Sequence, residues 1–253
     1  MSLSEAEIQR YSRQILLREV GGIGQERLKA ARVLVVGMGG LGSPAALYLA
    51  AAGVGTLVLA DGDQVEASNL NRQILHSTAD IGRAKVDSAA DRLGALNPET
   101  QLLRLPHRLT DETLWQAVER VDLVVNGVDN FATTFALVDA CHRLGRPLVH
   151  AALYQDYGEL FVQQSHRGAP HPCYRCLHPA PPPPDLAPTC ATAGILGAVA
   201  GVMGALQAVE AVKLLVGSPA ALAEAVVIHD AWTLEHRRLG LKRRAGCRLC
   251  GSP

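Results

Sequence analysis

A short apolar run that ends in a cluster of glycines constrains this chain more than any other feature. Residues 33–42 read V-L-V-V-G-M-G-G-L-G, and the glycines are Gly37, Gly39, Gly40 and Gly42. Four apolar residues in succession predict a buried parallel strand, which the glycines then turn into a helix. Such a turn presents backbone N–H groups and a helix N-terminus to its ligand, which favours a phosphate. Asp61 ends the next strand-like run, where its carboxylate can hold a ribose hydroxyl.

Strand-like and helix-like segments alternate through the first 152 residues. We expect strands at 32–36, 56–60, 100–104, 121–126 and 147–152, and helices at 42–52, 83–96, 110–119 and 131–144. This alternation predicts an α/β fold of the doubly wound, Rossmann-like type with a mostly parallel sheet. Ligands of such sheets bind beyond the carboxyl ends of the strands. Gly37, Asp61 and Asp129 follow three such ends, so we expect them to meet in one crevice.

The pattern changes after residue 152. Further strands are expected at 157–164, 225–229 and 232–239, and a long helix at 193–216, after six prolines within 179–188. These C-terminal strands are expected to be antiparallel. Near the start of the chain, Ser4 and Glu7 fit a capping box for a first helix through about residue 17. We expect a single domain over 1–253, with a nucleotide-binding core at 1–152 and a second part at 153–253.

The net charge and the hydropathy of the chain limit the classes of partner and the compartment that we expect for it. With 24 Lys and Arg against 24 Asp and Glu, the formal net charge is zero, which gives no reason to expect nucleic acid or an anionic membrane as partner. The most apolar stretch, 193–206, is too short to span a bilayer and predicts a buried helix. The N-terminus has no signal-peptide profile, so a cytoplasmic protein is expected.

Polar residues beyond the glycine loop favour chemistry on phosphates over redox chemistry at a nicotinamide. Residues 68–73 read S-N-L-N-R-Q. The guanidinium of Arg72 can grip a phosphate, and Asn69 can donate a hydrogen bond. Lys85, near the start of a predicted helix, can neutralise charge on a transferring phosphate. Singly, these cations would be read as solvated surface residues; as a set beside a phosphate loop, they indicate a site.

Asp129 ends the segment V-V-N-G-V-D-N, directly after an apolar strand. A carboxylate at that end faces the ligand crevice, where it can bind Mg²⁺ held on nucleotide phosphates. The alternative is that Asp129 caps the helix that starts near Asn130.

Two C-x-x-C pairs predict a metal site. Cys173/Cys176 and Cys247/Cys250 supply four thiolates, enough for a closed, structural zinc site that ties the C-terminus to the middle of the chain. Cys141 is interpreted as a packed core thiol. Cys190 precedes a helix start, which can lower a thiol pKa and make it reactive; the alternative is a structural or incidental thiol.

Together these motifs resemble the MoeB/ThiF family, the bacterial relatives of ubiquitin-activating enzymes. The resemblance covers nearly the whole chain and runs through R-Y-S-R-Q, G-M-G-G-L-G, D-G-D-x-V-x-x-S-N-L-N-R-Q, G-V-D-N, H-P-C-Y-R-C-L, C-A-T-A-G-I-L-G and C-R-L-C. It implies an enzyme that binds ATP with Mg²⁺ and adenylates the Gly-Gly carboxylate of a small ubiquitin-fold sulfur carrier, releasing pyrophosphate. The acyl-adenylate then accepts sulfur and becomes a thiocarboxylate. By this resemblance, residues 153–253 form a zinc-stabilised, carrier-binding part.

The resemblance also implies roles for residues. The nucleotide would be bound by Gly37, Gly39, Gly40, Gly42, Asp61, Asp63, Asn69, Arg72, Gln73, Lys85, Asp129 and Asn130. Family members are homodimers in which an N-terminal arginine reaches the partner's ATP, and Arg13 matches it. The residues expected to act on the reacting groups are Arg13, Arg72, Lys85 and Asp129, with Cys190 as an optional carrier of the activated protein or of sulfur.

Several functional readings remain open from the sequence. The carrier could serve molybdenum cofactor synthesis, thiamine synthesis or tRNA thiolation. We expect no sulfurtransferase domain after residue 253, and therefore a separate donor of the cysteine desulfurase or rhodanese type. The alternatives from other classes are an NAD-dependent oxidoreductase and a non-catalytic, zinc-stabilised nucleotide-binding scaffold.

Overall fold

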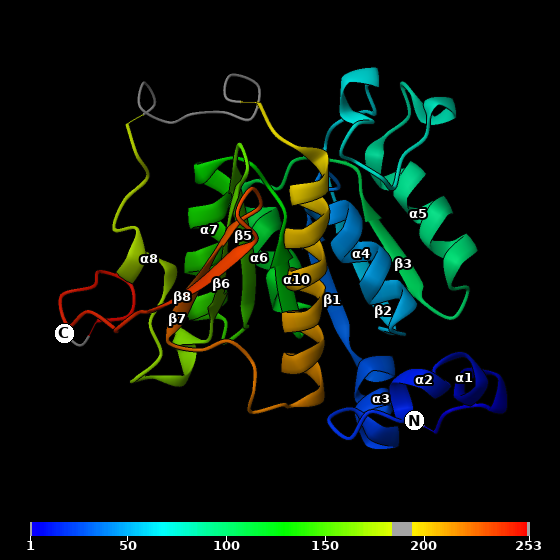
Figure 1. Ribbon diagram of the computed structural model, residues 1–253, viewed down its shortest axis with the longest axis horizontal. Helices are drawn as coiled ribbons and strands as arrows, with labels where there is room; N and C mark the ends of the chain where they lie inside the picture. The colour runs from blue at the N-terminus through cyan, green and yellow to red at the C-terminus, as the bar shows by residue number, and fades with distance from the viewer. Residues whose placement is uncertain (1, 184–193, 252–253) are drawn as a thin grey trace.

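The computed structural model describes residues 2–183 and 194–251, and its centre is an eight-stranded sheet (Figure 1). The strands are β1 (Arg32–Val36), β2 (Thr56–Ala60), β3 (Gln101–Leu105), β4 (Leu123–Asn126), β5 (Leu148–Tyr154), β6 (Tyr157–Gln163), β7 (Ala225–Asp230) and β8 (Glu235–Gly240). Their order is β3-β2-β1-β4-β5-β6-β7-β8. Strands β1 to β5 pair in parallel, and β6, β7 and β8 are antiparallel additions. The predicted doubly wound fold is confirmed.

Helices cover both faces of the parallel part of the sheet (Figure 1). One face carries α4 (Gly42–Ala51), α5 (Lys85–Leu96) and α10 (Gly197–Val216), and the other α6 (Asp111–Glu119) and α7 (Phe131–Arg143). Alternation along β1 shows why its sequence is apolar throughout: Val33 and Val35 belong to one core cluster, and Leu34 and Val36 to the other.

Helix α10 is long and apolar enough to cross a membrane by length and composition, with a mean hydropathy of 1.7, but half of that window is buried inside the molecule. Its polar side chains are used internally as well. Gln207 Nε2 donates to the Asn126 carbonyl at 2.7 Å, and Glu210 Oε2 accepts from the Leu222 N–H at 2.7 Å. The expected buried helix is confirmed, and among the described residues it begins at Gly197.

The N-terminal segment differs from its prediction. The capping box of Ser4 and Glu7 is present, but the helix it starts, α1 (Glu5–Arg10), ends well before residue 17. Tyr11 leaves the helical conformation, and its buried hydroxyl accepts from Asn97 Nδ2 at 2.8 Å. The helix is interrupted at this residue, and the chain continues as α2 (Ser12–Ile15) and α3 (Gly21–Ala30).

Helices α1 to α3 lie at the amino ends of the strands, because α3 runs directly into β1 (Figure 1). The remaining described helices are short: η1 (Ala67–Asn69), η2 (Thr78–Asp80), η3 (Ser165–Arg167) and α8 (Tyr174–Leu177).

Candidate functional site

The loop after β1 is held in shape by glycines that contact one another. Gly37 has a φ of +89°, which side chains rarely adopt, and a Cβ there would lie 2.9 Å from the Gly127 carbonyl. A Cβ on Gly42 would lie 1.7 Å from the Gly37 oxygen. The end of β1, the start of α4 and the end of β4 therefore meet with no room for side chains.

Asp61 fixes this loop from the end of β2. Its Oδ2 accepts from the Met38 N–H at 2.7 Å, and its Oδ1 accepts from the Asp63 N–H at 2.8 Å. Both carboxylate oxygens keep a further lone pair, so Asp61 can still accept from a ligand hydroxyl.

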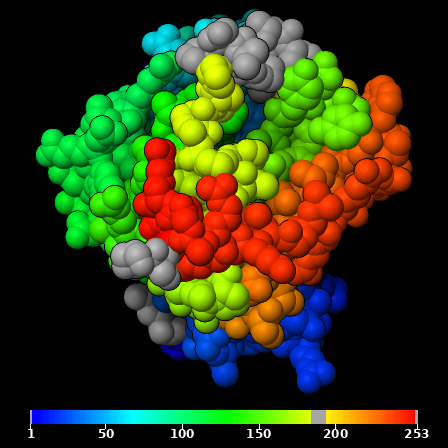
Figure 2. All heavy atoms as spheres, turned by 90° about the vertical axis from the view of Figure 1, so that its left-hand side faces the viewer, coloured from blue at the N-terminus to red at the C-terminus, as the bar shows by residue number. Residues whose placement is uncertain are grey.

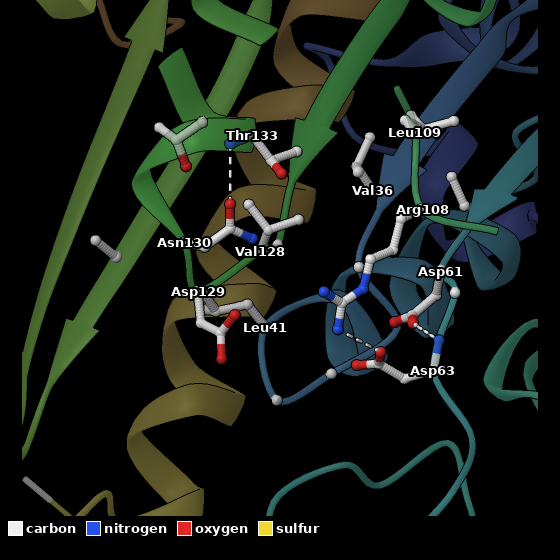
Figure 3. Close-up of a pocket in the computed structure, with 18 of the residues that line it drawn as sticks. Val36, Leu41, Asp61, Asp63, Arg108, Leu109, Val128, Asp129, Asn130 and Thr133 are labelled. Carbon is white, nitrogen blue, oxygen red and sulfur yellow. Dashed lines mark hydrogen bonds and ion pairs between the residues drawn. The ribbon is translucent and has the colours of Figure 1, made fainter. Parts of the chain in front are cut away.

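A pocket of about 580 Å³ opens at the carboxyl ends of β1, β2, β4 and β5, as the sheet topology requires. Figure 3 shows that most of its labelled apolar side chains lie apart from its carboxylates, with Leu41, beside Asp129, as the exception. Val36, Leu109 and Val128 lie toward one end, and the carboxylates of Asp61, Asp63 and Asp129 lie toward the other. An apolar end that fits a base, beside a charged end that fits ribose and phosphates, suits a nucleotide.

Lys85 supplies a buried cation at the charged end. It begins α5, and its Nζ lies 3.2 Å from Asp63 Oδ2. The other oxygen of Asp63 accepts from Arg108 Nη2 at 3.2 Å. Burial opposes ionisation of Asp63, but hydrogen bonding to Arg108 and the charge of Lys85 outweigh it and lower the pKa of this carboxyl. Asp63 is therefore a carboxylate at neutral pH that bridges two cations.

Asp129 is free to bind a ligand, because its neighbour performs the capping. Asn130 is the N-cap of α7, and its Oδ1 accepts from the Thr133 N–H at 2.9 Å. The alternative that Asp129 caps this helix is therefore wrong. The Asp129 carboxylate is exposed to the pocket and has no hydrogen bond or ion pair with any described residue (Figure 3). Free carboxylate oxygens of this kind suit Mg²⁺.

Most other predicted nucleotide residues also line this pocket. Gly37, Gly39, Gly40, Arg72, Gln73 and Asn130 are among them. Arg72 Nη1 donates to the Ser68 carbonyl and to Asn71 Oδ1, both at 3.0 Å. The Oε1 atom of Gln73 is buried without a partner among the described residues, which leaves an acceptor for a ligand.

Three predicted residues of the described structure lie elsewhere, and a fourth cannot be placed. Gly42 packs behind the glycine loop. Asn69 is buried, and its Oδ1 accepts from the Glu66 N–H at 3.2 Å, so it stabilises the η1 turn instead of facing the pocket of the described structure. Arg13 is exposed on α2, at the opposite end of the sheet (Figure 1). Cys190 lies outside the described residues.

The pocket lining also includes polar side chains that were not predicted from the sequence, among them Arg108, His150 and Tyr174. His150 lies on β5, and Asn126 Nδ2 donates to its Nδ1 at 2.9 Å. Burial lowers the pKa of His150 to about 4, so it is neutral at physiological pH. Its place near the carboxyl end of a predicted strand is the signal that would have found it.

The four predicted metal ligands meet in one cluster. Their Sγ atoms all lie within 4.8 Å of one another, with 3.5 Å between Cys173 and Cys247 and 3.5 Å between Cys176 and Cys250. Sulfurs around a tetrahedral zinc ion at about 2.3 Å are about 3.8 Å apart, so the cluster fits a metal ion of that kind. Burial raises the pKa of the Cys173 thiol, and thiolates this close need a cation to neutralise them.

The first cysteine turn links this cluster to the pocket. Arg175 donates through Nε and Nη2 to the Asp139 carboxylate on α7 at 2.6 and 2.7 Å. Tyr174 lines the pocket, with its ring centroid 4.7 Å from that of His150. Figure 2 shows the C-terminal residues, in red, beside this yellow-green turn, and the Arg244 N–H donates to Cys176 Sγ at 3.4 Å.

Comparisons with known proteins agree with this architecture. The ThiF family profile matches residues 11–249. A sulfur carrier protein adenylyltransferase from Thermus thermophilus is 45% identical over 253 residues, covering 99% of this chain and 93% of that protein. Adenylyltransferase and sulfurtransferase MOCS3 from Culex quinquefasciatus is 45% identical over 249 residues, covering 98% of this chain but 56% of that protein, so this chain spans about half its length.

The fold itself is found in a solved structure. A crystal structure of E. coli MccB with AMPCPP and MccA has a TM-score of 0.83 at 23% identity, covering 99% of this chain and 75% of that one. At that identity the match shows the fold alone. The family profile and the Thermus thermophilus relative each extend over almost the whole chain, and the chain therefore belongs to the ThiF family.

Proposed function

We propose that this protein is an adenylyltransferase that uses ATP to activate the C-terminal carboxylate of a small sulfur-carrier protein. The observation that carries the proposal is one pocket that combines a glycine loop of the phosphate-binding type, a buried lysine and Asp129, whose carboxylate has no partner among the described residues. The relative from Thermus thermophilus, named for sulfur-carrier adenylation, supports the same reaction.

The proposed step joins two anions. A carboxylate oxygen of the carrier forms a bond to the α-phosphorus, the bond from that phosphorus to the bridging oxygen breaks, and pyrophosphate leaves with its electron pair. No proton has to move at neutral pH, so positioning and charge neutralisation supply most of the rate. Arg72 and Lys85 hold positive charge at the pocket wall. Asp129 would hold Mg²⁺, which when bound neutralises phosphate charge.

The proposed substrate is a ubiquitin-fold protein that ends in Gly-Gly, since a tail without side chains can enter the pocket with the least steric hindrance. Residues 153–253 are proposed to bind it, and part of the proline-rich stretch 179–188 lies outside the described residues. The acyl-adenylate would then receive sulfur from a separate donor of the cysteine desulfurase or rhodanese type. The carrier would serve molybdenum cofactor synthesis, thiamine synthesis or tRNA thiolation.

Two further assignments belong to this proposal. The metal in the cysteine cluster is proposed to be zinc, because four thiolates with no open position form a structural site of the zinc type. The compartment is proposed to be the cytoplasm, because such thiolates survive where thiols are kept reduced.

ATP–pyrophosphate exchange tests the function directly. Purified protein, ATP, Mg²⁺ and labelled pyrophosphate are incubated with each of a panel of Gly-Gly carriers. Label should enter ATP only when a carrier is present. A carrier that lacks its last glycine is the matched control. Tight NADH binding without exchange would instead indicate an oxidoreductase, and ATP binding without exchange a scaffold.

We also propose that the protein is a homodimer. Helix α10 packs against α4, yet it leaves Val202 and Val209 exposed, and Tyr48 on α4 is 59% exposed. Apolar side chains on neighbouring helices favour a protein interface. Arg13 supports the same arrangement, because only a second copy could bring it to a pocket at the other end of the sheet.

The variant Val209→Glu is expected to convert the dimer into a folded monomer, because a carboxylate would lose its water in the interface. Sedimentation velocity measures the mass, and circular dichroism confirms the fold. The control is Leu234→Glu, in the loop between β7 and β8, whose side chain is also exposed. A Val209→Glu protein that sediments like the wild type would contradict this interface.

A further inference from the structure

Arg108 enters the pocket from the loop after β3. Its side chain is 86% exposed, and its only ion pair among the described residues is with Asp63, at 3.2 Å. In Figure 3 the guanidinium extends into the pocket, toward the end that carries the carboxylates. An arginine that belonged to the solvent-facing surface alone would not line the pocket wall.

The backbone under Arg108 is positioned by close packing. A Cβ on Gly62 would lie 2.6 Å from the Arg108 backbone nitrogen and 2.8 Å from its Cγ. Only a glycine at position 62 lets the loop after β3 approach the end of β2 this closely. The point at which Arg108 leaves the backbone is therefore fixed, while its side chain can change partners.

The charges around Arg108 indicate what its guanidinium can do in the pocket. Asp61, Asp63 and Asp129 all lie at the end of the pocket expected to receive the ribose and the phosphates. Asp63 also engages the buried Lys85, so a lone Asp63–Lys85 pair would offset the cation that a phosphate needs. Arg108 brings a second cation to the same carboxylate and presents further N–H donors in a planar fork that matches phosphate oxygens.

We propose that Arg108 is a further nucleotide-binding residue, which holds Asp63 in the ligand-free pocket and binds the phosphates of the nucleoside triphosphate when it enters. This rests on the proposed function for the identity of the nucleotide. The competing account is a surface ion pair with Asp63 and no ligand contact, which would contribute little to binding.

The test measures binding of MgATP and of adenosine by calorimetry, without any carrier, in wild type and Arg108→Gln. We expect MgATP to bind about tenfold more weakly to the variant, the loss of a hydrogen bond to a charged group. Adenosine should bind both proteins equally. Arg108→Lys, which keeps the charge and loses the fork, should fall between them. The matched control is Arg104→Gln, an exposed arginine paired with Asp87 outside the pocket, which should bind MgATP normally.

Each other outcome has a distinct meaning. Equal MgATP binding by wild type and Arg108→Gln would overturn this inference and leave the proposed function standing. An equal loss for adenosine and MgATP would also overturn it, because the contact would then be with the nucleoside. A wild-type protein that binds no MgATP would overturn the proposed function itself.

Discussion

Replacement of Asp129 by alanine is expected to lower carrier-dependent ATP–pyrophosphate exchange at least about 100-fold, with the melting temperature unchanged. The physical reason is the division of labour at the start of α7. Asn130 makes the capping hydrogen bond, and the Asp129 carboxylate has no partner among the described residues. Alanine therefore removes the oxygens proposed to bind Mg²⁺, and their charge, without removing a hydrogen bond or ion pair seen among the described residues.

Asn130, the neighbour of Asp129, is expected to affect stability and serves as the comparison. Asn130→Ala removes the cap and is expected to cost about 1 kcal/mol of unfolding free energy, measured by urea denaturation. Asp129→Ala should show no such loss. An Asp129→Ala enzyme that keeps more than a tenth of the exchange rate over a range of Mg²⁺ concentrations would contradict the metal-binding role.

Among the changes proposed here, removal of a metal from the cysteine cluster is expected to lower the free energy of unfolding the most. Metal binding to four thiolates contributes directly to folding free energy, on the order of 10 kcal/mol in small zinc domains. In this protein a metal bound to the cluster would hold the C-terminal residues against the turn that contains Tyr174 and Arg175. A chelator, or Cys247→Ser, should lower the melting temperature by well over about 10 °C.

Metal removal should also affect the nucleotide pocket. Tyr174 lines it and Arg175 holds α7 through Asp139, so metal loss is expected to weaken nucleotide binding as well. The matched control is Cys141→Ala, a buried thiol in the core away from the cluster, which should retain its metal by elemental analysis. A chelated protein that is metal-free by that measurement and yet melts at the wild-type temperature would contradict the structural role.

Features carried by local sequence were predictable. The apolar runs placed the strands within a few residues, because a strand covered on both faces must be apolar at consecutive positions. The ends of those strands placed Gly37, Asp61 and Asp129 together, because parallel strands share one carboxyl edge. The doubled C-x-x-C spacing likewise indicated the metal cluster before any contact between its halves was known.

Features decided by contacts between distant segments were not predictable. Asn69 had the chemistry of a phosphate ligand, but packing buried it in a turn. Nothing in the sequence distinguished Arg108 from other loop arginines; its pairing with Asp63 depends on the close approach of its backbone to Gly62. The interruption of the first helix at Tyr11, whose hydroxyl bonds to Asn97, also depends on a distant segment. The sequence alone determined which elements form and where their ends meet, since those depend on periodicity. Only the tertiary structure decided which side chains line the pocket, because burial and partners arise from segments that no local pattern relates.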